Sequence, residues 1–348
     1  MTVPIEPTMR GRIVAIYSLL VVVNAGAWIW ALIAFRSYPV LLGTALLAYV
    51  FGLRHAVDAD HIAAIDNVTR KLMQQGQRPV GVGFYFSLGH STIVFFLSIV
   101  IALASVAFTG RFAALAGVGG IFGTCVSAGF LLAIAAANLF ILVSVYRTFQ
   151  TVKRGGPYVE EDVHLLLAKR GFLGRLFRSL FGLISHSWQM YLVGFLFGLG
   201  FDTATEVALL GISAKQASLG LPVWSILVFP TLFTAGMALI DTTDGIVMIG
   251  AYHWALNRPL RKLYYNLTIT FISVCVALLV GAIEVLGLLG DRLKLQGSIW
   301  SAIAALNGHF GLLGFLVIGV FVLSWLASIA IYRWNRYDKL EPRVEPAA

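Results

Sequence analysis

Charged residues are scarce in this chain of 348 residues, where Asp, Glu, Lys and Arg together make up 12% of the sequence. Soluble domains carry about twice that share, and they need it to cover their surface with polar side chains. Apolar residues reach 59% and the mean hydropathy is +0.87, which excludes intrinsic disorder. The composition argues against a soluble enzyme and predicts several membrane spans of about 20 residues each.

Cysteine is nearly absent, since only Cys125 and Cys275 occur and neither belongs to a C-x-x-C pair. This scarcity argues against a disulfide scaffold and against a thiol–disulfide carrier. The chain also lacks a G-x-x-x-x-G-K-[ST] motif, so we expect neither ATP hydrolysis nor a required ATPase subunit. The net charge of +9 is typical of basic cytoplasmic loops, and we expect no nucleic-acid partner.

Eight apolar segments are each long enough to cross a membrane as a helix. They cover residues 12–35, 39–64, 82–108, 117–146, 186–211, 222–251, 264–290 and 300–332. The sequence therefore predicts an all-α polytopic membrane protein with eight transmembrane helices in contact with lipid. We expect an N-terminal half at 1–146, a linker loop at 147–185, a C-terminal half at 186–332 and a tail at 333–348.

Basic residues predict the orientation of these spans, because cytoplasmic loops are enriched in Lys and Arg. If the N-terminus lies in the cytoplasm, the loops on the opposite side contain few of the 25 basic residues. Those few are Arg36, Arg111, Lys215, Arg292 and Lys294. We therefore expect both termini and the linker loop to be cytoplasmic.

Carboxylates within apolar spans are the most informative residues, because placing each of them in a bilayer is unfavourable. Seven fall inside the predicted spans, namely Asp58, Asp60, Asp202, Glu206, Asp241, Asp244 and Glu284. Asp66 lies at the end of the second span, and Arg54 is the single basic residue expected at comparable depth. Internal ion pairs cannot neutralise this excess, so the sequence predicts a pathway for a cation or for protons.

The second and third spans add histidines to these carboxylates. On a regular helix His55 and Asp58 share a face, as do Asp58 and His61, whereas Asp60 points elsewhere. A single site that uses all four needs a broken or distorted helix, unless Asp60 serves another partner. His90 lies in the third span. Imidazoles beside carboxylates suit a borderline transition metal such as nickel, and the lack of an accompanying cysteine disfavours copper(I).

Simpler roles stay open for several of these residues. A lone intramembrane histidine such as His90 often only hydrogen-bonds a neighbouring helix. Asp202 and Glu206 share a helix face, as do Asp241 and Asp244. Passage of a metal ion and a proton relay both account for these two pairs.

A short internal repeat also occurs. Phe51-Gly52-Leu53 recurs as Phe197-Gly198-Leu199 after 146 residues, and Gly89 corresponds to Gly236 after 147 residues. Spans two to four are then related to spans five to seven, and three spans per copy make the two copies inverted in the membrane. Inverted repeats with a substrate site at their interface are a common transporter architecture. Glycine positions can also coincide by chance, and this alternative stays open.

Four ordered motifs resemble those of the nickel/cobalt transporter family (NiCoT) of bacterial permeases. They are RHAVDADHI at 54–62, FSLGHSTIV at 86–94, LGFDTATE at 199–206 and GMALIDTTD at 236–244. The resemblance implies high-affinity uptake of Ni²⁺, Co²⁺ or both across the bacterial inner membrane, with the metal as substrate and no cofactor. It implies metal recognition by His55, Asp58, Asp60, His61 and His90. It further implies supporting or transport roles for Asp202, Thr203, Glu206, Asp241 and Asp244.

We therefore expect a secondary transporter and not an enzyme, with three alternatives left open. A transition-metal exporter of a related superfamily often carries a histidine-rich cytoplasmic loop, whereas the linker here contains only His164, which favours import. An integral membrane metalloenzyme also holds metal with His and Asp, but carboxylates that continue over two further spans favour a pathway. A simple cation channel is the third alternative.

Overall fold

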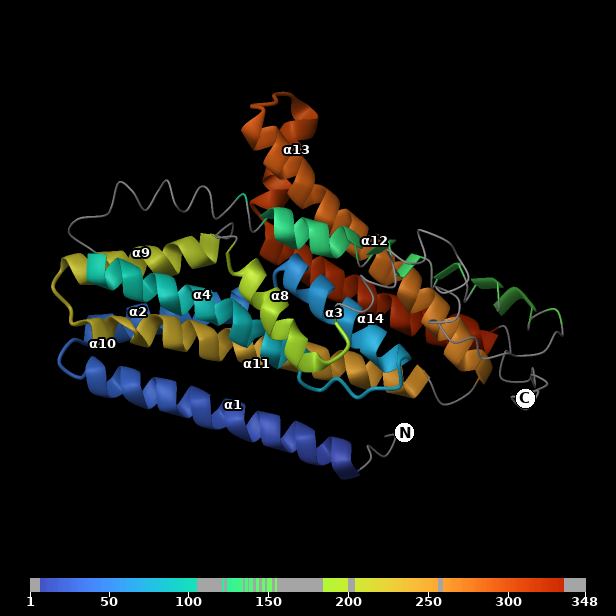
Figure 1. Ribbon diagram of the computed structural model, residues 1–348, viewed down its shortest axis with the longest axis horizontal. Coiled ribbons are helices and arrows are strands. Elements are labelled where there is room, and N and C mark those ends of the chain that lie inside the picture. The colour runs from blue at the N-terminus through green and yellow to red at the C-terminus, as the bar shows by residue number, and fades with distance from the viewer. Residues whose placement is uncertain are drawn as a thin grey trace.

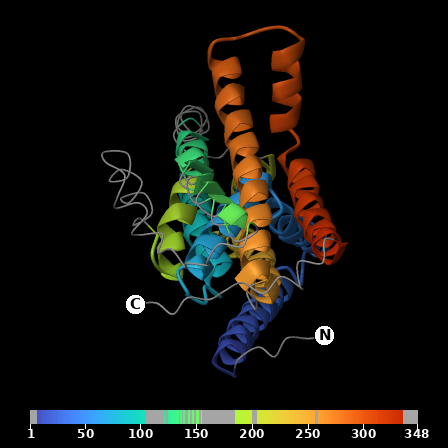
Figure 2. The same cartoon turned by 90° about the vertical axis from the view of Figure 1, so that its right-hand side faces the viewer.

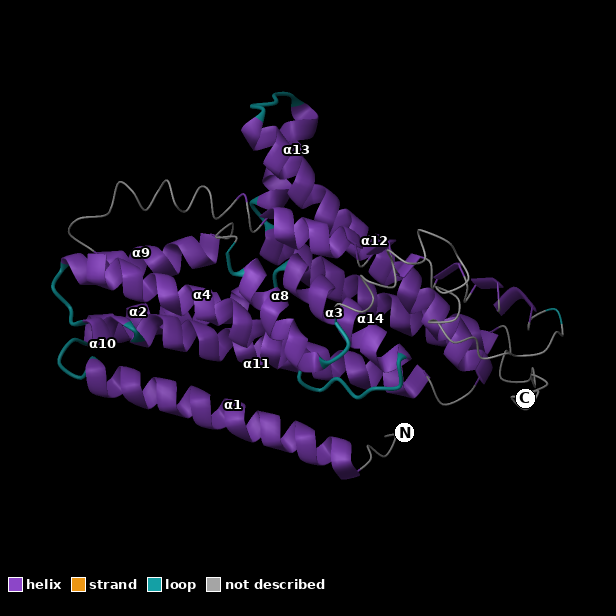
Figure 3. Ribbon diagram, in the orientation of Figure 1, coloured by secondary structure: helices purple, strands orange, loops and turns teal. Residues whose placement is uncertain are grey.

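The computed structural model of the chain describes residues 7–104, 184–199, 204–255 and 259–334, together with short pieces between 121 and 154. Within these residues every regular element is a helix and no strand occurs, as Figures 1 and 3 show. The expected all-α class is therefore confirmed for the part of the chain that is described.

The described ranges contain the following helices in chain order. Residues 7–104 form α1 (Pro7–Ala34), α2 (Pro39–His55), α3 (Ala59–Gln74) and α4 (Val82–Ala104). A 3-10 turn, η1 (Ser187–Gln189), leads into α8 (Met190–Phe197), α9 (Ala204–Ser218), α10 (Val223–Ile226) and α11 (Val228–Ala255). The remaining helices are α12 (Pro259–Arg292), α13 (Ser298–Asn307) and α14 (Phe310–Trp334).

Four stretches are long and apolar enough to cross a membrane, at Met9–Ala34, Val82–Leu103, Val223–Gly250 and Thr270–Arg292. Two further helix pairs are long and apolar enough when each pair is taken together, and both are bent, α2 with α3 by 50° and α13 with α14 by 81°. The protein is thus a multi-pass helical membrane protein with four to six spans among its described residues. Within the expected span at 117–146, the structure describes the shorter apolar helix Thr124–Ala133 and a few residues on either side of it.

The structure adds two features to the expected span at 39–64. The helix breaks after His55, and the second piece continues to Gln74, well into the region expected to be a loop. Every residue from Ala59 to Leu72 is buried, so Arg70 and Lys71 belong to the interior of the bundle and not to a cytoplasmic loop.

The polar side chains of α3 are stable in the interior because neighbouring elements supply their hydrogen-bond partners. The Arg70 guanidinium donates to Thr270 Oγ1 on α12 and to Asn67 Oδ1, both at 3.0 Å. Lys71 Nζ donates to the Ile184 carbonyl oxygen at 2.7 Å. A sequence that looks like a solvated loop is therefore a fully enclosed helix.

α11 is the central helix and packs against α1, α2, α3 and α4. Figure 1 shows α1 along the lower flank of the bundle and α4 beside α8 and α9. α12 packs against α3, α13 and α14, and Figure 2 shows α12 and α13 projecting from the rest of the bundle. α3 is therefore enclosed by α11 on one side and by α12 and α14 on another.

Helices α2 and α11 touch through glycines, which allow the two backbones to approach closely. A Cβ atom added to Gly52 would overlap the carbonyl oxygen of Phe233, and one added to Gly236 would lie 2.8 Å from the carbonyl oxygen of Tyr49. The contact therefore joins a Y-x-x-G motif on α2 to an F-x-x-G motif on α11.

The contact between α8 and α4 has the same composition. A Cβ atom on Gly194 would overlap the carbonyl oxygen of Phe86, and one on Gly89 would overlap the carbonyl oxygen of Tyr191. A Y-x-x-G motif on α8 thus faces an F-x-x-G motif on α4.

We expect Gly52→Ala to destabilise the protein, because the added methyl group meets a backbone atom that cannot move aside. Overpacking of this kind costs about 1–3 kcal/mol. Gly43→Ala on the same helix is the matched control, since nothing lies within 4 Å of its added Cβ, and alanine there gains helix propensity. Thermal unfolding of both variants in detergent measures the difference. Equal melting temperatures would show that the α2–α11 contact is looser than described.

Candidate metal centre

The break between α2 and α3 brings the residues of the first motif together. α2 ends at His55, and α3 begins at Ala59 after Asp58, whose φ of −65° and ψ of 145° are those of extended backbone. The Asp58 side chain does not cap α3 and instead reaches back to His55. The broken helix required by a site with both His55 and His61 is therefore present.

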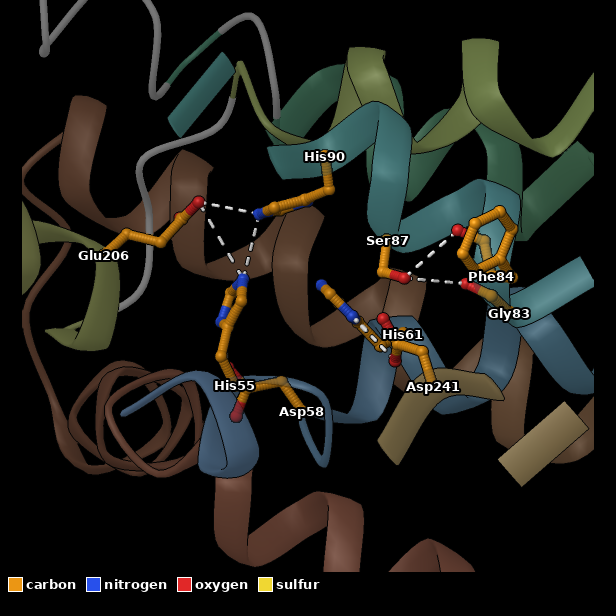
Figure 4. A network of polar contacts seen from close by, with 9 residues as sticks. All are labelled: His55, Asp58, His61, Gly83, Phe84, Ser87, His90, Glu206 and Asp241. Atoms are coloured by element: carbon orange, nitrogen blue, oxygen red, sulfur yellow. Dashed lines mark hydrogen bonds and ion pairs between the residues drawn. The ribbon is translucent and has the colours of Figure 1, made fainter. Parts of the chain in front are cut away.

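Three imidazole rings from α2, α3 and α4 form the core of the centre, as Figure 4 shows. The ring centroids of His55 and His61 are 4.6 Å apart, those of His55 and His90 are 4.8 Å apart, and those of His61 and His90 are 5.0 Å apart. All three residues are at most 2% exposed. The neighbourhood is closed by Phe86 and Phe233, whose rings lie against His61 and His55.

Each imidazole hydrogen-bonds a carboxylate. His55 Nδ1 donates to Asp58 Oδ2 at 3.0 Å, and His61 Nδ1 donates to Asp241 Oδ1 on α11 at 3.3 Å. His90 Nε2 donates to Glu206 Oε1 on α9 at 2.7 Å, and His55 Nε2 lies 3.0 Å from the same His90 nitrogen. The last two carboxylates thus connect α3 and α4 to α11 and α9 across the centre (Figure 4).

This pattern sets the tautomers of the first two histidines. With Nδ1 as the donor, a neutral His55 or His61 presents the lone pair of its Nε2 atom on the opposite side of the ring. A carboxylate behind the ring is also the usual outer partner of a histidine that ligates a metal. The two carboxylates therefore orient both rings as metal ligands are oriented.

Several polar atoms of the centre have no hydrogen-bond partner among the described residues. They are Asp60 Oδ1, His61 Nε2, His90 Nδ1 and Asp241 Oδ2. Buried polar atoms without a partner are rare in folded proteins, because each costs about 1–3 kcal/mol. Their concentration at one place indicates a site for a ligand that accepts electron pairs.

The spacing of the three histidines fits one metal ion. One nitrogen from each ring lies within 4.8 Å of the others. A metal–nitrogen bond is about 2.0–2.1 Å long, so two ligating nitrogens lie at most about 4.2 Å apart. Three nitrogens evenly spaced around one ion would lie about 3.6 Å apart, so the imidazoles move closer together when they bind it. Asp60, 8% exposed at the start of α3, adds a carboxylate to the same end of that helix.

The sequence-predicted residues are brought together unevenly. Hydrogen bonds join His55, Asp58, His90 and Glu206, and ring contacts place the bonded pair of His61 and Asp241 beside them. Asp244 lies on α11 one turn beyond Asp241, and Asp202 and Thr203 lie outside the described residues. Residue spacing did not indicate that Phe86 and Phe233 would line the centre, since both resemble ordinary lipid-facing residues.

A buried cluster of imidazoles and carboxylates at a helix break, inside a bundle of membrane-spanning helices, defines a polytopic transporter of cations. The family model described as high-affinity nickel-transport protein (NicO) matches residues 41–331. The chain belongs to this family of transporters and is not an enzyme.

Individual relatives agree with this assignment. The chain is 61% identical over 334 residues to the high-affinity nickel transport protein of Cupriavidus necator, covering 96% of this chain and 95% of the relative. It is 44% identical to the nickel transporter NixA of Staphylococcus aureus, covering 93% and 94% of the two chains. It is 40% identical to the cobalt transport protein NhlF of Rhodococcus rhodochrous, covering 83% and 82%. No solved structure matches the chain.

We expect Asp241→Asn to raise the stability of the metal-free protein. Asp241 is fully buried, and one of its oxygen atoms has no partner among the described residues, so the carboxylate must be protonated or left uncompensated. An amide of the same shape removes the buried negative charge, and a charged group without a partner costs more than the roughly 1–3 kcal/mol of a neutral one. The measurement is thermal unfolding in detergent with a chelator present. Asp291→Asn, at an exposed position, is the control, and a lower melting temperature for Asp241→Asn would contradict the expectation.

Proposed function

We propose that the chain imports Ni²⁺, Co²⁺ or both across the bacterial inner membrane as a secondary transporter. The observation that carries the proposal is the buried cluster of three imidazoles, each bonded to a carboxylate. Nitrogen donors without thiolate suit a borderline divalent metal such as nickel or cobalt. The names of the relatives, two nickel transporters and a cobalt transporter, support the same metals.

The residues divide into ligands and supporting groups. In this proposal His55, His61 and His90 bind the ion directly, with Asp60 as an additional oxygen ligand. Asp58 and Asp241 hold the first two rings in their tautomers, and Glu206 receives the His90 proton. Asp202, Thr203 and Asp244 belong to the pathway that the ion follows to and from this centre.

Import follows from the membrane potential without ATP. An inside-negative potential contributes about 2.3 kcal/mol per charge per 100 mV, which is about 4.6 kcal/mol for a divalent ion. The ion leaves the extracellular side, loses its hydration shell to the imidazoles and carboxylates, and is released to the cytoplasm. Both termini and the linker 147–185 lie in the cytoplasm in this arrangement, between transmembrane halves at 1–146 and 186–332, with a tail at 333–348.

We further infer that eight spans contain two inverted repeats. The contacts of α2 with α11 and of α8 with α4 support this, because each joins a Y-x-x-G motif to an F-x-x-G motif. Gly52 then corresponds to Gly194 with an offset of 142 residues, and Gly89 to Gly236 with an offset of 147. The contacts therefore favour pairing Gly52 with Gly194, at an offset of 142 residues. The recurrence of Phe51-Gly52-Leu53 pairs Gly52 with Gly198 instead, at an offset of 146 residues.

The helix breaks support the same alignment. α2 ends at His55, and α8 ends 142 residues later at Phe197. The alignment places Asp202 at the position of Asp60. In two inverted copies, broken helices meet at the substrate site, and a rocking motion of one copy against the other opens it to each side in turn.

We expect His61→Ala to abolish metal accumulation. The test compares bacteria that express the wild type, His61→Ala, or an empty vector at trace concentrations of Ni²⁺ and Co²⁺, with matched amounts of protein in the membrane. The wild type accumulates metal saturably, while His61→Ala falls to the vector level because it loses a direct ligand. His309→Ala is the matched control, since His309 is exposed, and it keeps wild-type uptake.

Other outcomes identify other functions. Wild-type accumulation below that of the vector means export, and flux that never saturates with metal concentration means a channel. No difference for either metal, with the protein folded in the membrane, refutes the proposal. The ratio of Ni²⁺ to Co²⁺ in the wild type measures the metal preference.

A further inference from the structure

Polar residues continue beyond the histidines along the contact between α3 and α11. The two helices run in the same direction away from the centre, because His61 contacts Asp241 and a Cβ atom on Gly245 would lie 3.5 Å from Ile65 Cγ2 and 4.0 Å from Thr69 Oγ1. Asp66 follows His61 by five residues, about 7.5 Å along the helix axis. Because it lies between Ile65 and Thr69, the two residues of α3 that approach Gly245, it is near the level of Asp244 on α11.

Oxygen donors from three helices gather at this level. Asp66 is fully buried, and Ser273 Oγ on α12 donates to its Oδ2 atom at 2.6 Å. Asp244 Oδ2 is inaccessible to solvent and has no hydrogen-bond partner among the described residues. The two carboxylates come from the helices that flank the contact.

Thr69 is the second sign of a ligand site here. Its side chain is 0% exposed, and its hydroxyl has no hydrogen-bond partner in the described part of the chain. The hydroxyl is directed at α11 beside Asp244, as its distance to the Gly245 position shows. On a helix, Thr69 and Asp66 share a face, so the hydroxyl and the Asp66 carboxylate face the same space.

We propose that Asp66, Thr69 and Asp244 form a second, all-oxygen cation site that receives the divalent ion from the histidines. The inference rests on the proposed transport function for the identity of the ion, but not for the existence of the site. The Ser273 hydroxyl orients the Asp66 carboxylate in the way that outer partners orient metal-bound carboxylates.

The chemistry of the second site suits a step towards release. Carboxylates and hydroxyls prefer Mg²⁺, Ca²⁺ and Mn²⁺, whereas imidazoles prefer nickel and its neighbours. A nickel or cobalt ion is therefore bound more weakly by the oxygen site than by the histidines. Conduction requires sites from which the ion can leave, and a weaker site directly after a selective one meets this requirement.

Mn²⁺ is the probe for the second site, because it prefers oxygen ligands and its free concentration is measured by electron paramagnetic resonance. The test titrates Mn²⁺ into the purified full-length wild type, Asp66→Asn, Asp244→Asn, His61→Ala and the control Asp291→Asn. We expect Asp66→Asn and Asp244→Asn to weaken Mn²⁺ binding at least tenfold. His61→Ala and Asp291→Asn remain within twofold of the wild type.

The complementary measurements are Ni²⁺ binding by the same purified variants and Ni²⁺ uptake by bacteria that express them. Asp66→Asn keeps Ni²⁺ binding within twofold of the wild type, because the histidines are intact, whereas its initial rate of Ni²⁺ uptake falls at least tenfold. If Asp66→Asn does not fold, Thr69→Val replaces it and weakens Mn²⁺ binding in the same direction.

Three results overturn the inference: no Mn²⁺ binding by the wild type, unchanged Mn²⁺ binding in the two carboxylate variants, or loss of Mn²⁺ binding in His61→Ala equal to theirs. Slower Ni²⁺ uptake with unchanged Mn²⁺ binding assigns the carboxylates to proton transfer and also overturns it. Absence of wild-type Ni²⁺ and Co²⁺ uptake refutes the transport proposal alone, since Mn²⁺ binding is measured independently of it.

Discussion

Uncompensated charge is the constraint on which the rest of this structure depends. Asp58, Asp60, Glu206 and Asp241 are at most 8% exposed and lie around three imidazoles. Burial without compensation is strongly unfavourable for carboxylates, so these groups require protons or a metal ion. A fold optimised for stability alone would replace them with apolar side chains. Four buried carboxylates at one place are therefore typical of a site where cation binding is favoured at a cost in stability.

The helix break is what makes such a centre geometrically feasible. On an unbroken helix His55 and His61 would lie six residues apart on different faces, whereas the break after His55 brings their rings to 4.6 Å. The start of α3 also carries the positive end of a helix dipole, which stabilises the carboxylates of Asp58 and Asp60. Gly314 of α14 allows the bend to be packed closely, because a Cβ there would overlap the Val57 carbonyl oxygen. The bent backbone is thus held in place by its neighbour.

The sequence alone could predict the helical class and most members of the centre, because ionisable side chains are rare in apolar spans and usually functional there. It could also predict that His55, Asp60 and His61 require a broken helix. It could not predict that Arg70 and Lys71 are buried, since their partners, Thr270 and the Ile184 carbonyl, are more than 100 residues away. The proximity of Asp66 to Asp244 was hidden for the same reason, because it depends on how α3 and α11 lie against each other.

Ligands and compensating charges come from different parts of the chain, and this division has a mechanical consequence. All three imidazoles belong to α2, α3 and α4, whereas Glu206 and Asp241 belong to α9 and α11. The Coulomb energy between a divalent ion and a carboxylate falls with distance, and it is large where water is excluded. Under the proposed assignment of ligands, a small displacement of α9 and α11 would therefore weaken the binding of the ion and leave the three imidazoles together.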